Sequence, residues 1–264
     1  MESPLVQNPK TKKKKNLSKI ILWGVGIGIV ICGLVVFSVL YNFGRWNFGP
    51  KTLLILEPDY SLVSTVEPSD LETAIQILNA RCRALGCGSP FTVAENNQII
   101  AELPSSINLS NLIGYIKWVG LLEFVDFGET PIPAGTKIAT DFDYKYLQQI
   151  DSPKWHTIIT NSEFSSATVT QDKLGQYQVS FTLTPGGTKI LSDYTANNVG
   201  HYLGIVLDKA VITSPKITSP ITGGSGVING NFSQETANAL AVILSTEGPL
   251  PIPLVVKQVS DNGE

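Results

Sequence analysis

The chain has 264 residues, with 19 basic and 22 acidic side chains and a net charge of −3. Residues 1–19 hold six lysines and one glutamate, so residues 20–264 carry 13 basic and 21 acidic residues, a net charge of −8. Binding to nucleic acid needs clustered Lys and Arg to neutralise phosphates. An acidic region without a basic cluster therefore argues against a nucleic-acid partner.

Residues 20–40 are uncharged and mostly apolar. As a helix rising ~1.5 Å per residue, this stretch is about 31 Å long, close to the thickness of a bilayer's hydrocarbon core. The lysines before it predict a cytoplasmic N-terminus by the positive-inside rule. The alternative is a cleaved signal peptide, with an apolar core of about 7–15 residues and a small-residue cleavage site. Here the core is longer and Tyr41-Asn-Phe-Gly-Arg-Trp46 follows.

We therefore predict a single-pass membrane protein with a basic cytoplasmic tail (1–19), a transmembrane helix (20–41) and a tether (42–50). The globular region would then lie outside the cytoplasm. The run of lysines at 10–15 is interpreted as a topology signal on the tail. Contact with anionic lipid headgroups is the alternative.

The next part of the chain has the pattern of a small α+β unit. Ser69 and Glu72 form a capping box before apolar residues at helical spacing, and Gly86 is placed to end that helix. We expect strands at 52–56, 91–94, 98–103 and 121–127, and helices from 69 to 85 and from 109 to 119. This order, strand, helix, two strands, helix and strand, is that of a ferredoxin-like fold.

Cysteine usage leaves two readings open. Cys82 falls in the first expected helix and Cys87 just past its end, while Cys32 lies in the expected anchor. An oxidising compartment permits a disulfide between Cys82 and Cys87, but we favour two small buried side chains. No metal site is expected, because His156 and His201 are far apart in sequence and four ligands at a recognisable spacing are missing. No cofactor is expected either.

A Pro-rich segment at 128–136 marks a boundary, after which α and β elements again alternate without a long βαβα series. A helical turn is expected within 141–152. The expected strands are 167–171 and 176–183, joined at Gly175, then 202–207 and 210–212 around Asp208-Lys209, 227–228, and 252–258. Pro185 is expected to open a helix to about residue 197. Ser233 is expected to cap another, with Ala237, Leu240, Ala241 and Leu244 on its inner face. The predicted fold class is α+β.

No catalytic residues are predicted. The sequence Gly223-Gly-Ser-Gly226 has Val227 where a nucleophile elbow needs its last glycine, and we interpret it as a hairpin tip. A serine hydrolase would need a histidine held by a carboxylate, and neither His156 nor His201 has support for that role. Asp208 is expected to bond its own backbone in the turn.

An exposed strand edge could instead bind an extended peptide by β-augmentation. The candidate polypeptide contacts lie in 202–221 and are Tyr202, Ile205, Leu207, Val211, Ile212 and Ile217. The alternative is that Pro215 and Pro220 only blunt strand edges.

Five segments, in order, resemble SecD, the accessory subunit of the bacterial protein-export translocon. VLDKAVITSPKI at 206–217 is similar to its vLDg-x-v-x-saP-x-I pattern, INGNF at 228–232 to I-x-G-x-F, and GPLPIPL at 248–254 to GaLPiPl. RCRALG at 81–86 and LEF at 122–124 also match. The resemblance covers about residues 52–258 and implies a base with an inserted head. The base would comprise 51–128 with a return strand at 252–258, the head 129–251, and a tail 259–264.

The resemblance implies a non-enzymatic extracytoplasmic domain in the bacterial plasma membrane that assists protein export. Its partners would be subunits of the Sec translocon and unfolded exported polypeptide. SecD-type subunits continue into further membrane helices, which with SecF conduct protons, whereas this sequence stops at Glu264. We therefore expect a chain that cannot itself couple a proton gradient. The alternative is a structural or assembly module of another envelope complex.

Overall fold

The computed structural model describes residues 51–116, 118–147, 154–246 and 248–261. The predicted tail, transmembrane helix and tether, residues 1–50, lie outside these ranges, as does most of the helical turn expected within 141–152. Within the described ranges, none of the helices is long and apolar enough to cross a bilayer. The remainder is a mixed α+β fold, as predicted.

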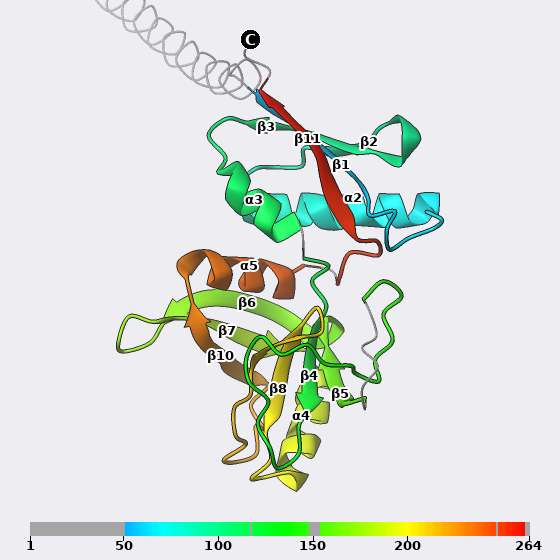
Figure 1. Cartoon of the computed structure of the whole chain (residues 1–264). Coiled ribbons are helices and arrows are strands. Elements are labelled where there is room, and N and C mark those ends of the chain that lie inside the picture. The colour runs from blue at the N-terminus through cyan, green and yellow to red at the C-terminus, as the bar shows by residue number, and fades with distance from the viewer. Residues whose placement is uncertain (1–50, 117, 148–153, 247, 262–264) are drawn as a thin grey trace, which may run out of the picture. The chain divides into compact units, whose positions relative to one another are not determined.

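The first sheet is antiparallel and has the strand order β11-β1-β3-β2 (Figure 1). Its strands are β1 (Lys51–Pro58), β2 (Phe91–Val93), β3 (Ile99–Pro104) and β11 (Leu254–Asp261), with a short 3-10 turn at Glu95–Asn97. Alternate residues of β1 are buried because successive side chains point to opposite faces. Helices α2 (Pro68–Ala84) and α3 (Leu109–Ile116) share one apolar core with the buried face. We call this part the base.

The ferredoxin-like order is present in the base, but one of its strands was assigned wrongly from the sequence. The last strand is β11 and not residues 121–127, and β11 runs to Asp261 rather than ending at 258. Residues 121–127 contain β4 (Leu122–Asp126), which pairs with two strands of another sheet. This strand is buried almost throughout, so its sequence lacks the alternation of apolar and polar residues that would have indicated which sheet it joins.

The start of α2 also differs from the prediction. The capping box at Ser69 and Glu72 is wrong, because the N-cap is Glu67, whose side chain makes no capping hydrogen bond. Pro68 occupies the first turn, where its fixed φ and missing N–H cost nothing. The predicted end is confirmed, since Gly86 has φ +81° just after the helix.

Cys82 and Cys87 are joined by a disulfide, with their Cα atoms 5.1 Å apart. The reading that we favoured, two separate thiols, is wrong, although both residues are buried in the base core as expected. A helix end that turns back through Gly86 brings the two Cβ atoms within bonding range.

Replacing both cysteines with serine is expected to lower the free energy of unfolding by about 2 kcal/mol. The small value follows from the short closed loop of about six residues. Urea unfolding of the wild-type protein, with and without dithiothreitol, and of the double variant measures it. Identical midpoints for the oxidised and reduced protein would contradict the assignment.

Two further sheets form the part inserted between α3 and β11, which we call the head (Figure 1). One has the order β5-β4-β8-β9 and the other β10-β7-β6, and all neighbouring strands are antiparallel. The strands are β5 (His156–Thr160), β6 (Phe164–Gln171), β7 (Tyr177–Leu183), β8 (Leu203–Leu207), β9 (Ala210–Thr213) and β10 (Ser225–Phe232). The helices are α4 (Pro185–Asn197) and α5 (Gln234–Leu244), with a 3-10 turn at Asn161–Glu163.

The head core joins both of its sheets. Phe124 of β4 lies edge-on to Phe164 and Phe181, with ring centroids 5.4 and 5.6 Å away. Such edge-to-face contacts add to the energy of burial. Residues of α4 and α5 complete the same cluster, so the two sheets and two helices are packed around one core.

Local signals in the head were read correctly in most cases. The helix from Pro185 to Asn197, the Ser233 cap, the turn at Gly175 and the hairpin at Asp208-Lys209 are all confirmed. Strand β5 was missed, and β6 and β10 are longer than predicted. The glycines at 223 and 224 do not form a hairpin tip, because they connect β9 to β10, which belong to different sheets.

Candidate functional site

A groove of about 780 Å³ is lined mostly by apolar residues, which come from both base and head. Its apolar lining residues are Leu62, Trp118, Val119, Tyr146, Leu147, Leu207, Ala210, Val211, Ile212, Phe232, Leu240, Pro253, Leu254, Val255 and Val256. The few polar residues are Asp59, Lys137, Asp208 and Thr236. A concave, mostly apolar surface with a few polar groups is the usual form of a binding site.

One wall of the groove is the edge of the base sheet. β11 is the end strand of that sheet, and among the described residues it pairs with β1 alone. Leu254, Val255 and Val256 all line the groove. The side chains of consecutive strand residues point to opposite faces of a sheet. Because all three of these consecutive residues line the groove, the groove runs along the edge of the strand. An edge of this kind offers backbone donors and acceptors to an extended chain.

The facing strand, β9, is also at the end of its sheet, but its edge is largely covered. The amide of Gly135 donates to the carbonyl of Val211, and the amide of Val211 donates to the carbonyl of Thr136. These bonds occupy the groups that β-augmentation at the 202–221 hairpin would require. The available edge is therefore on the base.

The six predicted contact residues divide by burial. Ile205, Leu207, Val211 and Ile217 are buried in head clusters, so their main role in this structure is packing. Tyr202 and Ile212 are half-buried, and three of the six, Leu207, Val211 and Ile212, line the groove. Lys216 lies over the ring of Tyr202, 5.8 Å from its centroid. Contact of the six with polypeptide stays a prediction.

Beside the groove, the chain passes from base to head through residues 118–121, which we call the linker. Arg81 of α2 is 2% exposed and donates to two linker carbonyls, those of Trp118 at 2.8 Å and Val119 at 2.9 Å. Burial lowers the pKa of Arg81 to about 10, opposed by the charge of Asp208, so the guanidinium stays charged at neutral pH. The linker is thus fixed to the base by a buried cation.

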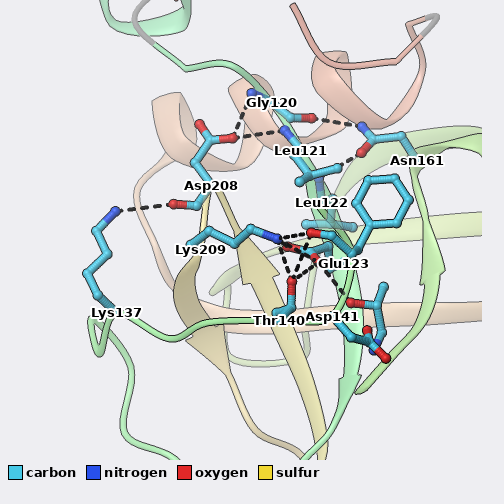
Figure 2. A network of polar contacts seen from close by, with 12 residues as sticks. Gly120, Leu121, Leu122, Glu123, Lys137, Thr140, Asp141, Asn161, Asp208 and Lys209 are labelled. Carbon is cyan, nitrogen blue, oxygen red and sulfur yellow. Dashed lines mark hydrogen bonds and ion pairs between the residues drawn. The ribbon is translucent and has the colours of Figure 1, made fainter. Parts of the chain in front are cut away.

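Two side chains of the head also hold the linker (Figure 2). One carboxylate oxygen of Asp208 accepts from the amides of Gly120 and Leu121, at 2.9 and 2.8 Å. The prediction that Asp208 bonds its own turn is therefore wrong. Asn161 adds two bonds, donating to the carbonyl of Gly120 and accepting from the amide of Leu122. Burial raises the pKa of Asp208, opposed by the two amides and by Arg81.

Gly120 is the residue at which these contacts meet. Its φ is +88°, and a Cβ there would collide with the guanidinium of Arg81. Only glycine satisfies both conditions without strain. We call Arg81, Asp208 and Asn161 the clamp, since together they satisfy the polar backbone groups of the linker.

A buried ion pair lies next to the clamp (Figure 2). Lys209 Nζ lies 3.0 Å from a carboxylate oxygen of Glu123, with the two side chains 3% and 0% exposed. The ammonium also donates to the hydroxyl of Thr140 and, at 2.8 Å, to the carbonyl of Phe142. Glu123 accepts from the hydroxyls of Thr140 and Thr157. Paired and hydrogen-bonded in this way, both charges are tolerated in the interior.

The two histidines make separate contacts. His156 Nδ1 lies 2.6 Å from the carboxylate of Asp141, and His201 Nδ1 lies 3.8 Å from that of Asp126. The bond to His156 and the amide of Thr157 lower the pKa of Asp141 against the effect of burial. Neither histidine is among the residues that line the groove.

The clamp and the ion pair were not predicted. Glu123 and Lys209 stand in or between apolar runs, and a charge in such a place is the sequence signal that could have drawn attention to these two residues. Hydrogen-bonded partners in the clamp and the ion pair are 17 to 88 residues apart in sequence, so no local pattern contains the site.

Comparison with known proteins gives a consistent result. A family profile described as the SecDF P1 head subdomain matches residues 144–252. The protein translocase subunit SecD of Dictyoglomus turgidum is 30% identical over 231 residues, covering 86% of this chain and 51% of the relative. SecDF of Thermus thermophilus is 32% identical over 275 residues, covering 93% and 35%.

Two solved structures agree with this. One, of a SecDF membrane component that enhances protein export, has a TM-score of 0.60 and 30% identity, covering 78% of this chain and 98% of that one. The other, SecDF in a super-membrane-facing form, has a TM-score of 0.66 and 28% identity, covering 94% and 35%.

The described region is therefore similar to a domain of protein translocase subunits. The chain belongs to the SecD family. It spans about half, or less, of the length of the curated relatives that it matches.

Proposed function

We propose that this chain assists protein export by holding extended, apolar segments of exported polypeptide in the groove. The observation that carries the proposal is the apolar groove along the open edge of β11. Backbone hydrogen bonds to a strand edge are independent of sequence, and apolar walls accept many side chains. Such a site suits a partner that must bind chains of varied sequence in an unfolded state.

The proposal includes the topology expected from the sequence. Residues 20–41 would anchor the chain once in the bacterial plasma membrane, with the N-terminus in the cytoplasm and the domain outside. Base and head would be separate subdomains, the head inserted in the base, and subunits of the Sec translocon the neighbours. The role would be non-enzymatic: binding in the groove requires no reactive group.

The test compares two valines of β11. Val255 lines the groove and is 37% exposed, whereas Val259 on the same strand is 43% exposed and is not among the lining residues. Val255→Asp is expected to weaken binding of a fluorescent 15-residue Val/Ser peptide about tenfold, because a lost valine contact is worth about 1.5 kcal/mol. Val259→Asp is expected to leave the affinity unchanged. The anisotropy of the peptide, titrated with the full chain in detergent, measures both.

Equal effects of the two substitutions would argue against the groove. Capture of translocon subunits by crosslinking in cells tests the export role separately. Stable capture of a different envelope complex, without exported chains, would favour an assembly module instead.

A further inference from the structure

A segment of the head reaches back to the base. Residues 140–147, which we call the strap, follow the Pro-rich boundary and have no regular secondary structure. One end is fixed in the head, where the hydroxyl of Thr140 and the carbonyl of Phe142 accept from Lys209. The amide and carboxylate of Asp141 add bonds to Trp155 and Thr157.

The other end of the strap lies in the base. Tyr146 is 9% exposed and belongs to the base core, together with residues of α2, α3 and the base sheet. Tyr144 donates its hydroxyl to the carbonyl of Leu250, at 2.6 Å. Burial raises the pKa of Tyr144 to about 12, so the hydroxyl remains a donor at physiological pH. The strap thus joins base and head in addition to the two main-chain crossings and to the contacts that α2 and α3 make with α5.

The strap also forms part of two cavities. Tyr146 and Leu147 line the groove. Phe142 and Tyr144 line a second cavity of about 670 Å³, together with Leu121 of the linker. Any displacement of the strap from the base therefore changes the walls of the groove directly.

The strap is attached more firmly to the head than to the base. The head end rests on a buried ion pair with a full set of hydrogen bonds, which is costly to disrupt. The base end rests on one aromatic ring and one neutral hydrogen bond. Separation would therefore begin at Tyr144 and Tyr146, with the strap remaining on the head.

The head end of the strap depends on Lys209, which has φ +62°. A glycine suits this left-handed position but has no ammonium to hold Thr140 and Phe142. The ammonium of Lys209 thus holds the strap to the head.

We propose that the strap is a latch that holds base and head together and sets the width of the groove, opening when Tyr146 leaves the base core. The consequence for polypeptide rests on the function proposed above, whereas the latch itself does not. Opening would widen the groove while the clamp keeps the linker in place. The latch then regulates access to the groove.

The test measures the distance between base and head by pulsed electron spin resonance. Spin labels are placed on exposed positions of α2 and α4, through Glu72→Cys and Ala196→Cys, in the full chain with Cys32→Ser. Tyr144→Phe removes one hydrogen bond and keeps the ring, so the open population is expected to rise about fivefold. Tyr146→Ala removes the anchor itself, and a rise of at least about tenfold is expected. Tyr177→Phe, which removes a hydroxyl bonded to Gln234, is the matched control.

Unchanged distance distributions in folded Tyr144→Phe and Tyr146→Ala would overturn the latch. Should Tyr146→Ala fail to fold, Tyr144→Phe decides alone. Binding of the Val/Ser peptide is measured on the same samples and is expected to strengthen in both variants. A shift in distance without any peptide binding would leave the latch standing and reject the groove as the polypeptide site.

Discussion

Lys209→Gly is expected to lower the free energy of unfolding by about 2–4 kcal/mol. Removing one member of a buried ion pair costs about 3–5 kcal/mol, because the remaining charge is left unpaired. Here Glu123, which is fully buried, would lose its cation. Glycine at a left-handed position offsets about 1 kcal/mol of this cost by relieving backbone strain. Urea unfolding of the full chain, followed by circular dichroism, measures the difference.

The double variant Lys209→Gly with Glu123→Gln separates the charge from the packing. A neutral glutamine can still accept from the hydroxyls of Thr140 and Thr157, so at least about 2 kcal/mol of the loss should return. Lys137→Ala, on an exposed lysine that contacts the same turn, is the matched control and should change stability little. If Lys209→Gly alone were as stable as the wild type, the ion pair of Lys209 and Glu123 would not contribute to stability as argued.

Arg81→Ala is expected to destabilise the domain by about 3–5 kcal/mol and to loosen the linker. Two of its bonds to the linker are short, and a hydrogen bond to a charged group is worth about 1.5–3 kcal/mol. Hydrogen exchange should accelerate at the amides of Gly120, Leu121 and Leu250, the last of which donates to the carbonyl of Val119. Denaturant unfolding and exchange followed by mass spectrometry check the two effects.

The control for Arg81 lies in the same helical turn. Arg83 is exposed and donates to the hydroxyl of Ser89, and Arg83→Ala should change the free energy by less than about 0.5 kcal/mol. Arg81→Lys should lower the free energy of unfolding by an intermediate amount, because one ammonium group cannot reach all of the carbonyls that the planar guanidinium reaches. Similar losses in Arg81→Ala and Arg83→Ala would show that the linker does not depend on the buried guanidinium.

Much of the local structure could be predicted because its causes lie within a few residues. Pro185 and Ser233 start helices through their own backbone and side-chain chemistry, and Gly175 allows a tight turn. The sheet to which residues 121–127 belong could not be predicted, because a strand buried almost throughout gives no sign of its neighbours.

The candidate site was less accessible to sequence reasoning. The groove exists only because β11 and β9 come together from distant parts of the chain. The residues singled out in 202–221 are largely apolar, and apolar residues form cores more often than surfaces. Arg81 was recognised only as part of a helix end, since its three acceptors lie 34 to 38 residues further along.

The insertion of the head between α3 and β11 has a consequence for how the chain folds. β1 must pair with β11 across a sequence separation of about 200 residues, as Glu57 and Lys257 illustrate. Closing so long a loop in an unordered chain is entropically costly and slow. A head that folds first removes this cost, because the amide of Leu250 bonds the carbonyl of Val119 and so brings the two crossings together. Once the head has folded, β11 is held close to β1. Pairing of these two strands, which completes the base sheet, is then the last step of folding.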